Sequence, residues 1–571
     1  MTMDRPATAA QLIGQAFDAY HERFRAMARA TADHFAHRRW EAMHRNAVGR
    51  LDLYNATVQA AVTQLRRVLG PWIEDRDHWP AIKTAYARIL ARRPDEEIGE
   101  TFYNSVTRRF FHTVGVDPAI EFIWFDPPYL PQGRAIRRYP YTPDLSGLMA
   151  RLLSDLPLGA PFADLPRDAG RVAQSIQDHV RQIWHTGHFQ ALEILRPILY
   201  RGKAAYVVGR VLRGTRLHPL AIALLHGPRG VTVDATLLTE RELSILFSFA
   251  HTYFHADIQR PSHVVGFLRT LMPLKPIAEL YIALGYHKHG KTVLYRDLHR
   301  HLKQTTDRFI MAPGTKGMVM AVFTLPSYEI VFKVIKDRFA FPKSATRRQV
   351  MERYKLVFHH DRVGRLMDAQ EFEHLTLARE RFDPDLLAEL QQVASQAVVV
   401  REHDVVLTHV YTQRRVHPLD LYIKEVSPEK ARAAVIDYGN AIKELATANI
   451  FPGDLLIKNF GVTRNRRVVF YDYDELCLLS EVNFRRLPQA TTYEDELAAE
   501  PWFAVGPHDV FPEEFRTFLW FPKELRPIME EVHGDLFTPE FWWAMQERQR
   551  TGQEPDFFPY GAHRRYPATE P

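Results

Sequence analysis

Hydrophobic positions near the start of the chain repeat with the period of an α-helix. One stripe is formed by Ile13, Phe17, Tyr20, Phe24 and Met27, and a second by Val58, Val62, Leu65 and Leu69. Successive members are three or four residues apart, so their side chains share one face of a helix. The pattern predicts long helices over about residues 8–70, with both stripes turned toward a core.

Shorter apolar runs predict strands further along the chain. A proline-rich segment at residues 126–131 predicts a loop first, because proline lacks the backbone donor and restricts the residue before it. The runs at residues 205–208 and 231–233 lie between glycine and proline turns, as short strands do. Helical spacing returns over about residues 239–300.

The pattern changes near residue 305, where strand-like runs follow one another closely at residues 319–323 and 330–335. With 571 residues, the chain is also longer than the roughly 250–300 residues over which one hydrophobic core grows. We therefore predict an α+β protein, with a mainly helical domain over residues 1–305 and a second domain over residues 306–571.

Composition excludes a mainly disordered chain. Hydrophobic residues make up 46% and charged residues 25%, the balance of an ordinary globular protein. The net charge of +6 is small for this length, so it suits a phosphate or an acidic partner and predicts no nucleic-acid binding. Cys477 is the single cysteine, and neither a signal-peptide core nor an apolar run of about 18 residues is present. These features predict a cytoplasmic protein without a disulfide or a membrane span.

A glycine-containing segment precedes the strand predicted at residues 319–323. It consists of Ala312, Pro313, Gly314, Thr315, Lys316, Gly317 and Met318. Glycines allow a tight turn and bring backbone N–H groups close to phosphate oxygens. The G-x-x-G spacing differs from both the P-loop and the G-x-G-x-x-G loop of kinases, so a plain β-turn is the alternative interpretation.

Two lysines follow on the next predicted strand. In kinases a lysine on the third strand reaches the α- and β-phosphates of ATP. Lys333 and Lys336 are three residues apart, so they project to opposite faces of the strand and only one of them faces a cleft. Both have apolar neighbours, and the period of two does not choose between them. A surface lysine with a buried stem is the alternative for either.

Asp454 and Asn459 have the D-x-x-x-x-N spacing of a kinase catalytic loop. In that loop the aspartate accepts the proton of the substrate hydroxyl and the asparagine binds Mg²⁺. The segment follows a predicted helix that carries Ala434, Ile442, Leu445 and Ala446. Pro452 and Gly453 replace the usual His-Arg before the aspartate, and this spacing alone is common by chance.

A strand-like run ends at Asp472, within the sequence V-V-F-Y-D-Y-D. A short hairpin with its turn at residues 464–467 connects this run to Asn459, and a hairpin returns the chain to its starting end. Asp472 is therefore predicted to lie beside Asn459, where a kinase keeps the aspartate that binds Mg²⁺. The glycine segment, the strand lysine, the Asp454 loop and Asp472 occur in kinase order, which predicts an atypical ATP-dependent phosphotransferase.

The sequence resembles the isocitrate dehydrogenase kinase/phosphatase family over essentially its whole length. The resemblance is carried by residues 312–336, by D-R-V-G-R at 361–365, by D-A-Q-E-F at 368–372, and by residues 449–454 with D-Y-D-E at 472–475. These motifs are far more specific than general kinase patterns. The resemblance implies a regulatory N-terminal domain and a bilobal protein-kinase-like domain, with an N-lobe near residues 306–416 and a C-lobe near residues 417–571.

The resemblance also implies a role for each candidate residue. ATP is bound by the segment from Ala312 to Met318 and by Lys333, the kinase base is Asp454, Mg²⁺ is held by Asn459 and Asp472, and the phosphatase reaction uses Asp368. The resemblance therefore favours Lys333 over Lys336 as the lysine that binds ATP. From the residues alone, Asp368 is a loop carboxylate or a helix cap ahead of Gln370.

Members of the family phosphorylate a serine of isocitrate dehydrogenase, which inactivates it, and remove the same phosphate. The resemblance therefore implies ATP, ADP and Mg²⁺ at one shared site, isocitrate dehydrogenase as the partner, and control of carbon flow between the citric acid cycle and the glyoxylate bypass. AMP is implied as an effector that binds between the two domains and favours the phosphatase. Residues 482–522, which include Glu494, Asp495, Glu496 and Trp502, are implied to recognise the substrate. A homodimer is left open.

Other interpretations of the sequence stay open at this point. The chain is alternatively an atypical kinase of another substrate or a nucleotide-sensing scaffold, although a scaffold has no need of Asp454, Asn459 and Asp472 together. A metal-dependent hydrolase is disfavoured, because the sequence has no H-E-x-x-H motif and no thiolate cluster. Glu352 and Glu371 are both candidates for the glutamate that pairs with the strand lysine in kinases.

Overall fold

A computed structural model describes residues 4–91, 93–123, 135–185, 187–248, 253–314, 316–341, 343, 345–360, 363–489, 503–519, 521–553 and 557–567. The proline-rich segment at 126–131, Thr315, residues 361–362 and the residues Glu494, Asp495, Glu496 and Trp502 lie outside these ranges. The chain divides into two units. The first contains residues 1–248, 252–306 and 558–571, and the second contains residues 249–251 and 307–557.

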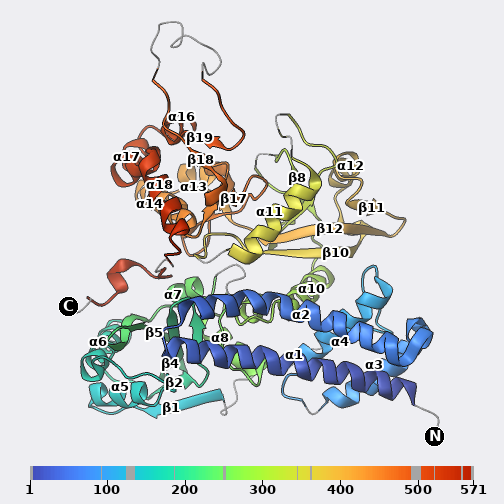
Figure 1. Cartoon of the computed structure of the whole chain (residues 1–571), viewed down its shortest axis with the longest axis horizontal. Coiled ribbons are helices and arrows are strands. Elements are labelled where there is room, and N and C mark those ends of the chain that lie inside the picture. Colours follow the sequence, from blue (N-terminus) through green and yellow to red (C-terminus); the bar gives the residue numbers. More distant parts are fainter. Residues whose placement is uncertain are drawn as a thin grey trace. The chain divides into compact units, whose positions relative to one another are not determined.

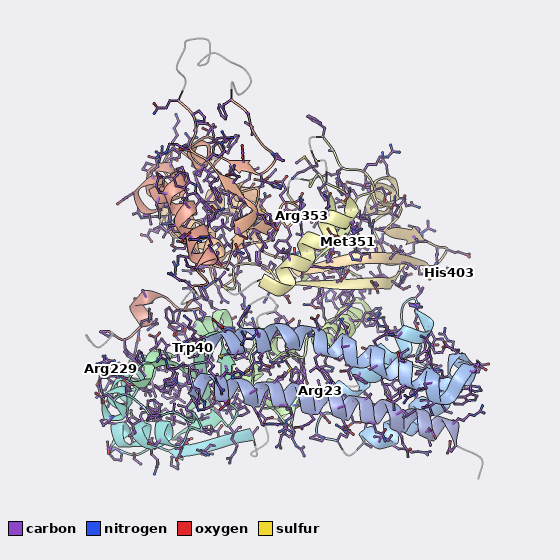
Figure 2. The ribbon with its side chains drawn as sticks, in the orientation of Figure 1. Arg23, Trp40, Arg229, Met351, Arg353 and His403 are labelled. Carbon is purple, nitrogen blue, oxygen red and sulfur yellow. The ribbon has the colours of Figure 1, made fainter. Side chains whose placement is uncertain are left out.

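Long helices open the first unit, as the hydrophobic stripes predict (Figure 1). α1 (Arg5–Ala36) begins after Asp4, whose side chain accepts a hydrogen bond from a backbone N–H of the first turn. α2 (Trp40–Leu69) packs alongside α1. Every residue of the two stripes except Met27 is buried, whereas Arg23 lies on the exposed side of α1 (Figure 2). The prediction of long helices facing a core is confirmed.

The rest of the first unit combines further helices with an antiparallel sheet. The helices are α3 (Trp79–Leu90), α4 (Glu96–Phe111), α5 (Leu145–Ser154), α6 (Leu165–Trp184), α7 (Glu240–Leu246), α8 (Pro261–Leu271), α9 (Ile277–Ala283) and α10 (His287–Gln304). The strands are β1 (Ile136–Pro140), β2 (Ala191–Leu195), β3 (Leu199–Arg201), β4 (Ala204–Arg213), β5 (Arg216–Gly227) and β6 (Gly230–Leu237). They pair in the order β1-β2-β4-β5-β6, with β3 on β4. The expected strands at residues 205–208 and 231–233 lie in β4 and β6, within a larger sheet than those two runs predict.

The C-terminal tail of the chain packs within the first unit. Arg565 forms an antiparallel bridge with Ala235 of β6. Its guanidinium donates a 2.9 Å hydrogen bond to the carboxylate of Asp234, and the hydroxyl of Tyr560 donates one of 2.7 Å to the same carboxylate. Asp234 is 7% exposed, so these tail residues compensate a buried charge. The second unit is therefore an insertion between the main part of the first unit and its tail.

The second unit begins with an antiparallel sheet in the order β10-β12-β9-β8-β7, with β11 on β12. Its strands are β7 (Ile310–Met311), β8 (Met320–Leu325), β9 (Tyr328–Ile335), β10 (Ala369–Ala378), β11 (Val398–Val400) and β12 (Asp404–Arg414). The strand-like runs at residues 319–323 and 330–335 are confirmed as β8 and β9. The helices α11 (Arg347–His360) and α12 (Pro384–Val393) belong to this part. α11 packs on the sheet through Tyr354, whose ring stacks on Tyr411 of β12 at 4.0 Å between centroids.

The remainder of the second unit is mainly helical. Its helices are α13 (Leu419–Glu425), α14 (Pro428–Thr447), α16 (Phe515–Phe518), α17 (Arg526–His533) and α18 (Pro539–Arg550). Short strands pair in the order β13-β15-β16 and as β14 with β17 and β18 with β19. They are β13 (His417–Pro418), β14 (Ile450–Phe451), β15 (Phe460–Val462), β16 (Val468–Phe470), β17 (Cys477–Leu478), β18 (Asn483–Phe484) and β19 (Asp509–Val510). The α+β prediction is confirmed.

Candidate active site

Lys333 lies on β9 with its ammonium buried against the segment that carries Asp472. The residue is 5% exposed, and its Nζ donates a 2.8 Å hydrogen bond to the backbone carbonyl of Tyr471. The same Nζ lies 5.1 Å from the centroid of the Tyr471 ring. Burial lowers the pKa of Lys333, while the negative charges of Asp472 and Asp474 act in the opposite direction. A buried cation thus faces two carboxylates at the end of β16.

Asp472 and Asp474 form a carboxyl pair in the Y-D-Y-D segment. Burial raises the pKa of Asp472, and the charge of Asp474 and a hydrogen bond that the protonated Asp472 donates to the Asp474 carboxylate raise it further, against the opposing effect of Lys333. Asp474 is 9% exposed and lies 3.4 Å from Nζ of Lys343, which also pairs with Glu475. Paired carboxylate oxygens are the hard ligands that Mg²⁺ prefers, so these residues would fit a magnesium ion.

The hairpin after Asn459 has the predicted form. β15 and β16 pair antiparallel, with Phe460 opposite Phe470. The next residue along, Tyr471, donates its backbone N–H to the carbonyl of Asn459 at 3.1 Å. The hairpin therefore returns the Asp472 segment to the start of β15, as the spacing predicts. Asn459 itself is 6% exposed.

Asp454 is half-buried on a loop whose Gly453 lies against Glu475. Its Oδ1 accepts a 2.9 Å hydrogen bond from the backbone N–H of Leu456. The preceding Gly453 has φ +79°, and a Cβ on it would lie 2.3 Å from the carbonyl oxygen of Glu475. Only glycine fits this close approach, so the Pro-Gly that replaces His-Arg has a structural reason here. The amide of Asn459 completes the loop with a 3.5 Å contact to the backbone carbonyl of Asp454.

Asp368 lies directly before β10, so it caps no helix. Its Oδ2 accepts a 2.8 Å hydrogen bond from the amide of Gln370. The preceding residue, Met367, donates its N–H to the carbonyl of Phe470 at 2.9 Å, and its own carbonyl accepts a hydrogen bond from the hydroxyl of Tyr473. Two contacts on either side of Asp472 therefore tie down the Asp368 segment. The fold brings together two regions that are far apart in the sequence.

The glycine-containing segment forms the connection from β7 to β8. Ala312 donates its N–H to Val322 at 3.0 Å, and Gly314 has φ +115°. Nζ of Lys336 donates a 2.6 Å hydrogen bond to the carbonyl of Gly317, so this lysine holds the loop. Pro313 and the exposed Met318 lie on the same connection, while Thr315 is outside the described residues. Lys316 extends away to pair with Glu389 of α12 at 2.7 Å.

Neither candidate glutamate supplies a carboxylate to Lys333 in the described part of the chain. Glu352 is exposed on α11 and pairs with Arg348 at 2.8 Å, and Glu371 on β10 pairs with His409 at 2.6 Å. The helix α11, which carries the labelled Met351 and Arg353 in Figure 2, instead turns Tyr354 toward the sheet. The partner charges of Lys333 come from the Y-D-Y-D segment.

Sequence reasoning missed Asp474 and Lys343 as members of this cluster. Asp474 could have been identified from the sequence, because it is separated from Asp472 by a single tyrosine. Lys343 lies in a connection that contains no recognisable motif. In the described ranges, no group of three or more histidine, cysteine or acidic side chains is arranged to hold a metal by itself. The described helices also include none with the length and hydropathy needed to cross a bilayer.

Comparison with known proteins covers both units. The family model described as isocitrate dehydrogenase kinase/phosphatase (AceK) kinase domain matches residues 307–562, and the one described as isocitrate dehydrogenase kinase/phosphatase (AceK), regulatory domain, matches residues 10–306. The chain is 47% identical over 564 residues to the isocitrate dehydrogenase kinase/phosphatase of Anaeromyxobacter sp. (strain Fw109-5), with 98% of each chain covered. It is 42% identical over 566 residues to the protein of that name from Xanthomonas axonopodis pv. citri (strain 306), again with 98% of each covered.

Proposed function

The chain belongs to the isocitrate dehydrogenase kinase/phosphatase family, and from that premise we propose that it phosphorylates isocitrate dehydrogenase and removes the same phosphate. The observation that carries the proposal is the cluster of Lys333, Asp472 and Asn459 around one hairpin, with Asp454 on the adjoining loop. These are the residue types that phosphoryl transfer from ATP requires.

In the kinase direction, each of these side chains has a distinct task. Asp454 accepts the proton of the substrate serine hydroxyl, because a carboxylate on the catalytic loop is the group nearest the acceptor in such sites. Lys333 binds the α- and β-phosphates of ATP, and the segment from Ala312 to Met318 covers them. Asp472 and Asn459 would hold Mg²⁺, with Asp474 beside them. When bound, Mg²⁺ neutralises charge that builds up on the phosphate oxygens.

In the phosphatase direction, a second carboxylate is needed. Asp368 is the candidate, since its segment is bonded to both Phe470 and Tyr473 on either side of Asp472. It orients or deprotonates the attacking water, or protonates the serine oxygen as phosphate departs. Because Asp454 lies on a different loop, the two activities are separable by mutation.

Regulation by AMP and the metabolic role follow from the family. We propose that AMP shifts the enzyme toward the phosphatase, and that the two activities together direct carbon between the citric acid cycle and the glyoxylate bypass in the cytoplasm. The large first unit supports a regulatory role, since Lys333, Asp368, Asp454, Asn459 and Asp472 all lie in the second unit.

The decisive experiment uses the purified full-length protein with isocitrate dehydrogenase and γ-labelled ATP, with and without AMP. Label should enter a serine of isocitrate dehydrogenase and inactivate it, and AMP with ADP should release the label as phosphate. Labelling of other proteins but not of isocitrate dehydrogenase would instead identify a kinase of another substrate. Nucleotide binding without any transfer would identify a scaffold.

Three variants assign the roles in the same assay. Asp454→Ala should lower the kinase rate by about 10²–10⁴-fold while nucleotide binding persists. Asp368→Ala should abolish most phosphatase activity and leave the kinase, so that isocitrate dehydrogenase stays phosphorylated. Asp472→Ala should lose both activities, because the metal site serves both directions. Equal loss of both activities in Asp368→Ala would assign it a structural role, and survival of the phosphatase in Asp472→Ala would exclude a shared site.

A further inference from the structure

Arg365 is a buried arginine with a complete set of acceptors. It is 3% exposed, and it lies three residues before Asp368. Its guanidinium donates to both oxygens of Asp437 at 2.8 Å each, to both oxygens of Glu444 at 2.6 and 3.1 Å, and to the backbone carbonyl of Val468 at 2.8 Å. A guanidinium has five N–H groups, so all of them are used.

The two carboxylates come from one face of α14. Asp437 and Glu444 are seven residues apart, which corresponds to two helical turns. Burial alone would raise the pKa of Asp437, but the charge and hydrogen bonds of Arg365 hold it below its ordinary value. Burial likewise opposes the charge of Arg365, and the two carboxylates outweigh it and raise the pKa of the guanidinium. The guanidinium is therefore bidentate to both carboxylates.

The backbone around Arg365 is bonded to the same strand that its side chain reaches. Phe470 donates its N–H to the carbonyl of Arg365 at 2.7 Å, and Leu366 forms a parallel bridge with Phe470. The N–H of Val468 in turn donates to Asp437 at 2.6 Å. One side chain thus joins α14, β16 and the segment that leads into β10. The last of these carries Asp368, and β16 leads to Asp472.

We propose that Arg365 is a positioning residue for the phosphatase reaction, which it supports by fixing the distance between the Asp368 segment and the Asp472 segment. This rests on the proposed function, in which Asp368 serves the phosphatase. The kinase loop has supports of its own. Tyr438 donates its hydroxyl to the carbonyl of Leu455 at 2.5 Å, and Leu456 donates its N–H to Asp454. Loosening Arg365 therefore displaces Asp368 more than Asp454.

The test replaces the guanidinium of Arg365 by a group that keeps the positive charge but cannot make paired hydrogen bonds. Arg365→Lys retains a cation between the two carboxylates but loses the paired hydrogen bonds, because an ammonium is a point donor. Glu444→Gln is the milder second variant, since this carboxylate is 28% exposed. Lys443→Gln is the matched control, because it breaks an ion pair of 2.7 Å between α14 and Asp535 and touches neither Arg365 nor the Asp368 segment. Thermal unfolding of each variant shows which of them are folded.

Kinase and phosphatase rates are measured on one preparation of each full-length variant. Since a displacement of about 1 Å costs on the order of 10²-fold, Arg365→Lys should lower the phosphatase kcat by tenfold or more while the kinase rate stays within about threefold. Glu444→Gln should change the ratio in the same direction by less, and Lys443→Gln should leave it unchanged.

An equal loss of both activities in folded Arg365→Lys and Glu444→Gln, or an unchanged ratio, would overturn the proposal. If Arg365→Lys does not fold, the ratio of phosphatase to kinase rates in Glu444→Gln alone tests the proposal by the same criterion. A wild-type protein without phosphatase activity on phosphorylated isocitrate dehydrogenase would instead refute the proposed function, and this result is read before any variant is compared.

Discussion

Nζ of Lys333 donates a 2.8 Å hydrogen bond to the backbone carbonyl of Tyr471, the residue directly before Asp472. The bond joins β9 to the segment that follows β16. It places a buried ammonium where the charges of Asp472 and Asp474 act on it. A lysine held by a main-chain carbonyl beside two carboxylates has its charge fixed in place before any phosphate arrives.

Lys333 should matter far more for nucleotide use than its neighbour Lys336. Lys333→Met removes the buried cation beside Asp472 and should lower kcat/KM for the kinase reaction by about 10²-fold, the cost of losing one fixed donor to a developing charge. Lys336→Met removes only the hydrogen bond to the carbonyl of Gly317 and should cost about tenfold or less. Steady-state kinetics with varied ATP measure both. The reverse order would show that the other face of β9 meets the nucleotide.

Gly453→Ala should impair the kinase although position 453 carries no catalytic group. The new Cβ would lie 2.3 Å from the carbonyl oxygen of Glu475, at a residue with φ +79°, so the loop that holds Asp454 has to shift. A shift of about 1 Å is expected to lower kcat on the order of 10²-fold. Gly170→Ala is the control, because a Cβ there meets nothing within 4 Å on α6. A Gly453→Ala enzyme as active as the control would contradict the role of this close contact.

The stability of the protein should fall as the pH rises, through Glu97 in the first unit. Glu97 is 2% exposed, and burial raises its pKa to about 7, although its Oε1 accepts a 3.0 Å hydrogen bond from the N–H of Ser262. Between the unfolded value of about 4.3 and about 7, the folded state binds more protons than the unfolded state. The free energy of unfolding therefore decreases through this window, by roughly 4 kcal/mol in total.

Glu97→Gln tests this pH dependence, because the amide keeps an acceptor for Ser262 and carries no charge. The variant should have a higher Tm than the wild type at pH 8, and the difference should largely disappear near pH 4, below the unfolded value. Differential scanning calorimetry at both pH values measures the effect. Glu22→Gln, at a carboxylate that is 65% exposed, serves as the control and should shift the Tm little at either pH. A Tm difference for Glu97→Gln that is the same at both pH values would contradict the assignment.

The C-terminal tail should stabilise the first unit. Arg565→Met leaves the buried carboxylate of Asp234 without its guanidinium partner, which should cost about 1–3 kcal/mol of unfolding free energy. Truncation after residue 557 should cost more, because it also removes Tyr560 and the bridge to Ala235. Urea unfolding measures both, with Arg550→Gln as the control at an exposed pair with Glu547. Unchanged stability after truncation would show that the tail is a passive extension.

Local features of the fold were predictable because their causes lie within a few residues. The stripes from Ile13 and from Val58 specify helices through a period of 3.6, and α1 and α2 carry them. The hairpin between Asn459 and Asp472 was predictable for the same reason, because a short turn brings the following strand back alongside the preceding one. The resemblance to a family added residue roles that no local pattern contains.

Contacts between distant segments were decided only by the tertiary structure. The sequence does not show that Met367 bonds to Phe470, that Arg365 joins α14 to β16, or that Arg565 of the tail pairs with Asp234. The sequence also left Glu352 and Glu371 as candidate partners of Lys333, whereas the negative charges that act on Lys333 are those of Asp472 and Asp474. Periodicity records which face of an element is buried, but the choice of neighbour depends on the packing and charge compensation of the whole core, to which each residue contributes only a small part.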